Sequence, residues 1–427
     1  MTDAREQDAL HVLRTLFESA LQAVSAEVTM PRAMPGAPHG RLVVVAVGKA
    51  AADMMRVARE RARRPVEGLI VTRHGHAPSG LNWPGIELIE AGHPYPDENS
   101  LRAADRALEI ARSLHAGDQL LLLLSGGGSA LLAAPTEGLS LADKQGVTKL
   151  LLRSGATISE INCVRKHLSR IKGGRLAVAA GSAQVTTWII SDVPGDDPSF
   201  VSSGPTVADA TTLQMARDII AKYRIDPPRP IAKALQDEAN ETPSADSLGL
   251  AGGEVRVIAR ARDALAAAAA AGGALGFTVS SLGDQLQAEA RHLGASHAAL
   301  ARRLASDGKP RLILSGGETT VTVVNNKGRG GRNMEYALGL AIALDGAPGI
   351  WALACDTDGI DGTEDAAGAI VGPDTLARAR KLGLDPARHL AENNAYLFFR
   401  ALGDLVITGP TGTNVNDFRA VLIEGRS

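Results

Sequence analysis

The chain has 427 residues, of which 45% are hydrophobic and 22% are charged, and its formal net charge is −2. Two or three domains are typical of this length, and a chain without excess positive charge lacks the field that attracts a nucleic-acid backbone. Aromatic residues amount to only 3%, too few for a surface that stacks the bases of a single strand. The composition therefore predicts close-packed α/β layers and no nucleic-acid partner.

The first 24 residues predict an amphipathic helix and not a signal peptide, because charged residues interrupt any apolar core. No segment approaches the ~18 apolar residues that span a bilayer. The two cysteines, Cys163 and Cys355, form no CxxC pair, so neither a disulfide framework nor a zinc site is expected. We predict a soluble, cytoplasmic protein with no membrane partner. The apolar face of the first helix is expected to hold Leu10, Leu13, Phe17, Leu21 and Val24.

Strand-like and helix-like segments alternate along the first half of the chain. The helix expected at 96–114 has cap candidates at Asp97 and Ser100, and a helical region spans about 140–180. This βαβ alternation predicts a Rossmann-like, mainly parallel sheet with helices on both faces. The expected strands are residues 41–47, 68–72, 86–91, 120–124 and 186–193.

Residues 225–253 hold four prolines and many small polar residues, a composition typical of linkers. A second alternating series follows and begins with VRVIA at 255–259. We therefore predict two α/β domains, residues 1–245 and residues 246–427.

The segment LLLLLSGGGSALL, residues 120–132, places three glycines directly after a strand that is expected to be buried. Glycines let backbone N–H groups approach a ligand at the carboxyl edge of a sheet, and a helix N-terminus would add the positive end of its dipole. LILSGGETTVTV, residues 312–323, repeats part of this pattern. A tight turn that binds nothing is the alternative. The predicted phosphate-binding or substrate-binding residues are Ser125, Gly126, Gly127, Gly128, Ser129, Ser315, Gly316, Gly317 and Glu318.

Two charged residues lie at the carboxyl ends of predicted strands, Lys49 just beyond the strand at 41–47 and Asp192 at the end of the strand at 186–193. Lys49, in VGKAA, would place its ammonium group at the sheet edge; a solvated lysine in a first helical turn is the alternative, although a cation there opposes the helix dipole. Asp192, in ISDVPGDDPSF, lies where a carboxylate could accept a hydroxyl proton. We take both residues as catalytic candidates.

The segment NKGRGGRNMEYAL, residues 326–338, is rich in glycine and arginine and leads into a predicted helix. Arg329 in the loop and Arg332 at the helix start suit bidentate contact with phosphate or carboxylate, with Asn333 beside them. A solvated basic loop is the alternative. We expect Arg332 to act in catalysis and the other two to bind.

ACDTDGIDGTEDAAGA, residues 354–369, carries aspartates after a predicted strand. A Mg²⁺ site needs only one or two protein carboxylates when nucleotide phosphates supply further ligands. Asp356, Asp358 and Asp361 are therefore candidate metal ligands, and Asp-Gly turns without a metal are the alternative. No G-x-x-x-x-G-K-[ST] and no G-x-G-x-x-G occurs in the chain, which argues against a Walker-type nucleotide site and an ordinary nicotinamide-binding protein.

Nine segments, taken in order, resemble the class II glycerate kinases. The resemblance covers residues 9–420. It implies an N-terminal glycerate-kinase domain, a C-terminal MOFRL-type α/β domain and an active site in the interdomain cleft. The segments are AVGKAA, GHPYPDENS, LLLLSGGGSALL, INCVRKHLSRIKGGRLA, IISDVPGDDPSFVSSGPT, LILSGGETTVTV, GRGGRNMEYAL, DTDGIDGTEDAAGA and TGPTGTNVND.

The resemblance also implies an activity: transfer of the γ-phosphoryl group of ATP, with Mg²⁺, to D-glycerate, giving 2-phosphoglycerate. By motif match the family's functional lysine, arginine and carboxylate fall on Lys49, Arg332 and Asp192. Two alternatives stay open: an NAD(P)H-dependent hydroxypyruvate reductase, a name that some members have carried, and a non-catalytic sugar-phosphate-binding module. A homodimer is compatible with the sequence, which does not define the oligomeric state.

Overall fold

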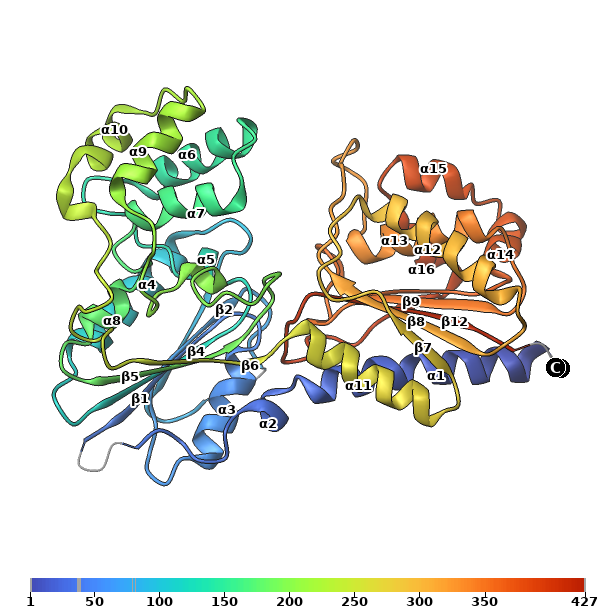
Figure 1. The fold of residues 1–427 in the computed structure, drawn as a ribbon, viewed down its shortest axis with the longest axis horizontal. Coiled ribbons are helices and arrows are strands. Elements are labelled where there is room, and N and C mark those ends of the chain that lie inside the picture. The colour runs from blue at the N-terminus through green and yellow to red at the C-terminus, as the bar shows by residue number, and fades with distance from the viewer. Residues whose placement is uncertain (1, 37–39, 79, 81, 426–427) are drawn as a thin grey trace. The chain divides into compact units, whose positions relative to one another are not determined.

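The structure, a computed structural model, describes residues 2–36, 40–78, 80 and 82–425. The chain folds into two units, each built on its own six-stranded sheet (Figure 1). The N-terminal unit is Met30–Ile258. The C-terminal unit combines Met1–Thr29 with Ala259–Ser427.

This division differs from the predicted domains, 1–245 and 246–427, at both ends. The segment at 255–259 was expected to open the second domain, but strand β6 (Glu254–Ala259) is the edge strand of the first sheet. Part of the expected linker is helical: Pro228 is the N-cap of helix α10 (Arg229–Gln236), and Pro230 lies in its first turn. These two prolines therefore mark the start of a helix.

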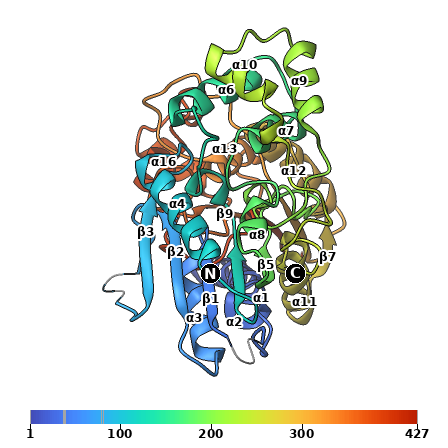
Figure 2. The same cartoon turned by 90° about the vertical axis from the view of Figure 1, so that its left-hand side faces the viewer.

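The sheet of the N-terminal unit has the order β3-β2-β1-β4-β5-β6, and Figure 2 shows β3, β2 and β1 side by side. The pairs β3–β2, β2–β1, β1–β4 and β4–β5 are parallel, as the βαβ pattern predicts. The first five strands are β1 (Leu42–Val47), β2 (Glu67–Arg73), β3 (Ile86–Ala91), β4 (Gln119–Leu124) and β5 (Gln184–Ile190).

Helices cover both faces of this sheet, as predicted. Helix α3 (Ala51–Arg61) lies on one face, and α4 (Glu98–Arg112) and α8 (Arg175–Ala179) lie on the other (Figure 1). Helix α4 begins with the predicted capping box, in which the Asp97 carboxylate accepts the Ser100 N–H at 2.9 Å.

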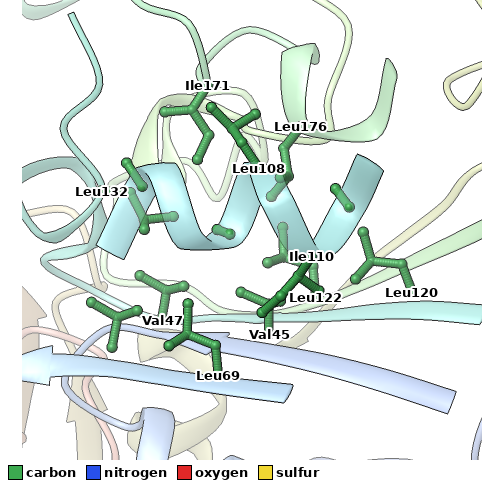
Figure 3. Packing of buried hydrophobic residues seen from close by; sticks show 14 of the residues in the cluster. Val45, Val47, Leu69, Leu108, Ile110, Leu120, Leu122, Leu132, Ile171 and Leu176 are labelled. Atoms are coloured by element: carbon green, nitrogen blue, oxygen red, sulfur yellow. The ribbon is translucent and has the colours of Figure 1, made fainter. Parts of the chain in front are cut away.

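The core between α4 and the sheet follows from strand periodicity. Alternate residues of β1 and β4, such as Val45 and Leu122, point toward Leu108 of α4, as Figure 3 shows. Their intervening neighbours are buried on the opposite face. Because both faces are covered, the leucine run of β4 is buried throughout.

Four further helices of the N-terminal unit form a separate layer with its own small core. Val147, Val164, Ile220 and Ile231 are among the buried residues of this core. The layer supplies the helices that run past the carboxyl edge of the sheet (Figures 1 and 2). The helices are α6 (Leu141–Arg153), α7 (Ile158–His167), α9 (Leu213–Lys222) and α10.

The sheet of the C-terminal unit is mixed, with the order β11-β10-β9-β12-β8-β7. Only β7–β8 pairs in parallel, whereas β12 pairs antiparallel with both β8 and β9. Among the described residues no helix is long and apolar enough to cross a membrane. The strands are β7 (Thr278–Ser281), β8 (Arg311–Gly317), β9 (Ile350–Asp356), β10 (Gly368–Val371), β11 (Leu405–Val406) and β12 (Asp417–Ile423).

Helix α1 (Thr2–Ala23) packs on this second sheet together with α11 (Ala261–Ala274) (Figure 1). Its residues Leu13 and Phe17 are buried, as is Val24 directly after it, and the Phe17 ring centroid lies 5.6 Å from that of Phe418 on β12. The amphipathic helix predicted at the N-terminus therefore forms. The other face carries α12 (Ala290–Ala305), α13 (Arg332–Leu344), α14 (Thr375–Lys381), α15 (Pro386–Ala391) and α16 (Ala395–Leu402).

A buried histidine makes the C-terminal unit sensitive to pH. Nδ1 of His297 lies 2.7 Å from the Tyr336 hydroxyl. Burial, and then the charge of Arg419, lower the pKa of His297 from 6.5 to about 4. Below about pH 6.5 the His297 imidazole is therefore protonated in the unfolded chain, whereas in the folded chain it stays neutral down to about pH 4. We expect stability to fall across this window by up to about 3 kcal/mol.

The substitution His297→Gln removes this titration and should flatten the dependence of the unfolding free energy on pH between about pH 7 and pH 5. Denaturant unfolding at the two pH values measures the effect. His292→Gln is the matched control, because His292 lies on the same helix and is exposed. An equally steep decline in both variants would contradict the prediction.

Candidate functional site

Three neighbouring strands carry predicted site residues on one edge of the N-terminal sheet. Lys49 follows β1, the segment 125–129 follows β4, and Asp192 follows β5. Because these strands are parallel and adjacent, their carboxyl ends share that edge. The strand order also reverses between β1 and β4, and open α/β sheets bind ligands at such a switch point.

The turn between β1 and α3 is bonded to the loop after β4. The Lys49 N–H donates to the Gly126 carbonyl at 3.0 Å, and the Ala50 N–H donates to Ser125 Oγ at 3.0 Å. A Cβ at Gly48 would lie 2.2 Å from Ser125 Oγ, so glycine is required there. Ser125 is fully buried and holds the two loops together. The structure therefore gives it a supporting position behind the exposed part of the loop.

Backbone conformation and close packing explain the glycines of this loop. Gly127 adopts φ +88°, a left-handed conformation, and a Cβ at Gly128 would lie 2.1 Å from Ser202 Oγ. Helix α5 (Gly128–Leu131) follows but is a single turn. The predicted helix-dipole contribution is therefore wrong, because one turn aligns too few peptide dipoles.

Ser129 is the centre of polar contacts that the sequence alone did not reveal. Its Oγ lies 3.0 Å from Lys172 Nζ, 2.9 Å from Arg165 Nη2 and 2.9 Å from Ser203 Oγ. Lys172 also donates to the Ser129 carbonyl at 2.8 Å. The signal was present, since the segment 161–177 is dense in cations, but only the fold shows which of them reach the loop.

The segment that contacts Ser129 is conformationally strained. Ser202, Ser203 and Gly204 have φ values of 53°, 61° and 56°. Two consecutive serines in the left-handed region cost of order 1–3 kcal/mol each and are held only where the surroundings define them. Such strain is concentrated at ligand sites, and here it lies beside Ser129.

The C-terminal unit places Arg332 among carboxylates. Arg332 is the first residue of α13; its Nε donates to Asp417 at 2.7 Å, its Nη1 to Glu318 at 2.9 Å and its Nη2 to Asp356 at 3.0 Å. Three adjacent strands gather the acids, since Asp356 ends β9, Asp417 begins β12 and Glu318 follows β8. Burial lowers the pKa of Arg332, but Asp417, Asp356 and Glu318 outweigh it and raise this pKa well above its ordinary value.

Asp417 is the central acceptor of this cluster, and it was not among the site residues predicted from the sequence. One carboxylate oxygen accepts from Arg332 and from Asn333 Nδ2, the latter at 2.8 Å; the other accepts from Arg419 and Thr319. Burial raises the pKa of Asp417, but the charges of Arg332 and Arg419 outweigh this effect and lower the pKa below its ordinary value. Its position directly after TNVN and before an apolar strand was the available signal.

Asp361 caps α13 and lies behind Arg332. Its two oxygens accept the N–H groups of Asn333 at 3.1 Å and Met334 at 2.8 Å. Burial raises the pKa of Asp361 to about 7, although these backbone bonds oppose the shift. Asn333 is fully buried, so its contacts are within the protein.

Arg329 and Arg332 have different surroundings. Arg329 pairs with Glu364 and lies over the Tyr396 ring, with its Cζ 4.7 Å from the ring centroid. Its side chain is 45% exposed, against 23% for Arg332. Arg332, and not Arg329, belongs to the carboxylate cluster.

The second predicted glycine loop is not a loop. Ser315, Gly316 and Gly317 are the last residues of β8 and are buried. A Cβ at Gly317 would lie 2.4 Å from the backbone of Leu286, and one at Gly316 would lie 3.2 Å from the Asp417 carbonyl. These glycines permit close backbone packing, so the expectation that the segment echoes the loop after β4 is wrong.

Within the described part of the chain, no group of three or more His, Cys, Asp or Glu side chains could hold a metal ion. The predicted ligands are engaged separately: Asp356 pairs with Arg332, Asp358 accepts the Ile360 N–H at 2.8 Å, and Asp361 caps α13. A metal cage made of these three aspartates alone does not fit this arrangement.

The fold and the site define a two-domain α/β protein with cations, a glycine loop and a carboxylate at the ligand-binding edge of a Rossmann-order sheet. Residues 12–236 match the family model described as "Domain of unknown function (DUF4147)", and residues 311–417 match the MOFRL family. The chain belongs to the glycerate kinase family with these two domains.

Relatives extend over almost the whole chain. A D-glycerate 2-kinase of Thermotoga maritima is 38% identical, over 96% of this chain and 97% of its own. A glycerate kinase crystal structure from the same organism has a TM-score of 0.86 at 38% identity, covering 98% of this chain and 100% of that one. An Agrobacterium vitis protein that carries the unverified name hydroxypyruvate reductase is 51% identical, over 97% and 94% of the two chains.

Proposed function

We propose that the protein is a glycerate 2-kinase. It transfers the γ-phosphoryl group of ATP to the 2-hydroxyl of D-glycerate, so that the new O–P bond replaces the bond to ADP and the hydroxyl proton is released. The names of the Thermotoga maritima relative and of the matching crystal structure support this reaction. The carboxyl edge of the first sheet supplies the chemistry that phosphoryl transfer needs, a cation and a carboxylate at one edge.

The hydrogen bonds of the turn after β1 favour a kinase over a reductase. In a dinucleotide-binding protein the backbone of this turn faces the pyrophosphate. Here the N–H groups of Lys49, Ala50 and Ala51 donate to Gly126, Ser125 and Gly48 instead. With these donors used inside the protein and no G-x-G-x-x-G present, the turn is poorly suited to a nicotinamide cofactor.

We assign three roles by this reasoning and by the match to the family. Lys49 neutralises charge on the transferring phosphoryl group. Asp192 orients the 2-hydroxyl and accepts its proton. The match to the family assigns a catalytic role to Arg332 as well; within its own unit the guanidinium is held in a fixed orientation by Asp417 and Asp356.

Mg²⁺ fits this proposal as an ion that arrives with ATP. Most of its ligands would then be phosphate oxygens and water, and one or two protein carboxylates suffice. Glu318 is the candidate carboxylate, because its side chain is 47% exposed beside Arg332. The ion would supply charge neutralisation to the phosphates.

A coupled assay with purified protein, ATP, Mg²⁺ and D-glycerate tests the proposal, with ³¹P NMR to identify the product. We expect ADP and 2-phosphoglycerate. ADP with 3-phosphoglycerate would keep the kinase and overturn the position of transfer. Tight binding of a phosphorylated ligand without turnover would indicate a non-catalytic binding module.

Reduction of hydroxypyruvate is the second candidate, and the name of the Agrobacterium vitis relative at 51% identity favours it. The same preparation should be incubated with hydroxypyruvate and NADH or NADPH. Oxidation of the nucleotide without ADP formation in the kinase assay would refute the kinase.

A further inference from the structure

Two buried lysines and one partly buried arginine of the N-terminal unit have no carboxylate partner in the described structure. They are Lys144 on α6, Arg165 on α7 and Lys172 in the segment before α8. Lys144 and Lys172 are 5% and 1% exposed. Their hydrogen bonds and ion pairs include no Asp or Glu, so positive charge is enclosed without an internal counterion.

Two of these cations converge on one oxygen. Lys172 Nζ and Arg165 Nη2 donate to Ser129 Oγ at 3.0 and 2.9 Å. A hydroxyl oxygen has two acceptor sites, so both are filled and the Ser129 proton is left to bond Ser203 Oγ at 2.9 Å. The ammonium and guanidinium groups are thus held at one point of the glycine loop. The three N–H groups of Lys172 are used, by Ser129 Oγ and by the Ser129 and Ser202 carbonyls, whereas the Arg165 guanidinium keeps further N–H groups for a ligand.

Lys144 adds an ammonium group whose Nζ is buried and has no hydrogen-bond partner within the described residues. Burial, and then the charges of Arg165, Arg175 and Arg170, lower the pKa of Lys144 well below its ordinary value. Burial, then Arg165 and Lys144, lower the pKa of Lys172 in the same way. Helices α6 and α7, which carry Lys144 and Arg165, pack around one hydrophobic core, and Arg165 and Lys172 meet at Ser129.

Adjacent cations on the same elements are compensated, which shows that the surroundings can supply partners. Lys166 pairs with Asp209 at 3.1 Å, and Arg170 pairs with Asp105 at 2.8 Å. A buried charge without a counterion is among the most costly features in a fold, so the absence of a carboxylate at these three positions indicates an external anion.

We propose that Lys144, Arg165 and Lys172, with the Ser129 hydroxyl, form an oxyanion site that binds a carboxylate or phosphate group of a small ligand. The proposal rests on the proposed function for the identity of that ligand: the carboxylate of D-glycerate or the phosphates of the nucleotide. Arg165 presents a planar pair of N–H donors that suits either group, and the two lysines add charge without fixed geometry.

Calorimetric titration of the full-length chain with D-glycerate, and separately with ADP, tests the site without requiring turnover. We expect Lys144→Met and Lys172→Met to weaken the binding of at least one of these anions by tenfold or more. If only the affinity for D-glycerate falls, the site binds a carboxylate; if only the affinity for ADP falls, it binds a phosphate. Lys149→Met is the matched control, because Lys149 lies on α6 and is exposed.

A second measurement separates this role from a structural one. Without ligand, Lys144→Met should unfold at the same temperature as the wild type or higher, because it removes an uncompensated buried charge. A lower unfolding temperature with both affinities within twofold of wild type would overturn the proposal, as would failure of the wild type to bind either anion. Anion binding without ADP formation would refute the kinase and keep the site, whereas an active kinase with unchanged affinities would refute the site.

Discussion

Replacement of Lys49 by alanine is expected to lower kcat for phosphorylation of D-glycerate by roughly 10²–10³-fold. Lys49 lies at the switch point of the first sheet, and its backbone N–H is fixed to Gly126 at 3.0 Å. Removing its ammonium group deletes a charge that stabilises the transferring phosphoryl group more than the ground state. The loss should therefore appear mainly in kcat, measured by initial rates at saturating ATP and D-glycerate.

Lys149→Ala is the control for Lys49→Ala, because it removes an exposed lysine from the same unit. It should retain wild-type kinetics. The thermal unfolding of both variants must match the wild type for the comparison to hold. Near-normal kcat in a folded Lys49→Ala protein would refute the assigned role.

Arg332→Ala is expected to abolish most of the activity and also to destabilise the C-terminal unit by about 3 kcal/mol. The reason lies in its partners: Asp417 and Asp356 are buried and would lose a counterion. Activity assays and denaturant unfolding of the same preparation measure the two losses. Assays below the unfolding transition separate lost catalysis from lost fold.

Arg329→Ala is the comparison that decides between the two arginines of the glycine-rich segment. The Arg329 side chain is 45% exposed and pairs with one carboxylate, Glu364, whose side chain is 8% exposed. Its removal should therefore cost less stability than Arg332→Ala, which leaves two buried carboxylates without this counterion. We expect a smaller effect on kcat than for Arg332→Ala. The reverse order of effects would move the catalytic assignment to Arg329.

Much of the fold could be predicted because local chemistry and tertiary packing agree. The leucines of β4 predict a strand covered on both faces, and the Asp97–Ser100 pair predicts the start of α4. The partnership of α1 with the second sheet was not predictable in this way. An apolar face shows that a helix packs against something, and Phe418, its partner, lies at the other end of the chain.

The candidate site shows the same difference between local sequence signals and contacts of distant residues. The position of Lys49 and Asp192 at one edge of the sheet could be predicted, because both lie just after strands whose carboxyl ends meet; their catalytic roles stay predictions. The contacts of Lys172 and Asp417 could not be predicted, because they are made across many intervening residues. The two LSGG segments were expected to have similar structures and do not. One forms a loop around Ser129, and the other continues strand β8 through Gly317.

The placement of α1 has a consequence for how the protein is made. Helix α1 is synthesised long before its partners in the same unit, since α11 and β12 begin at Ala261 and Asp417. Domains generally fold in the order of synthesis, so Met30–Ile258 can fold while the apolar face of α1 is still exposed to solvent. That face stays exposed until β12 has been synthesised, and deletion of α1 is expected to destabilise the unit that β12 completes.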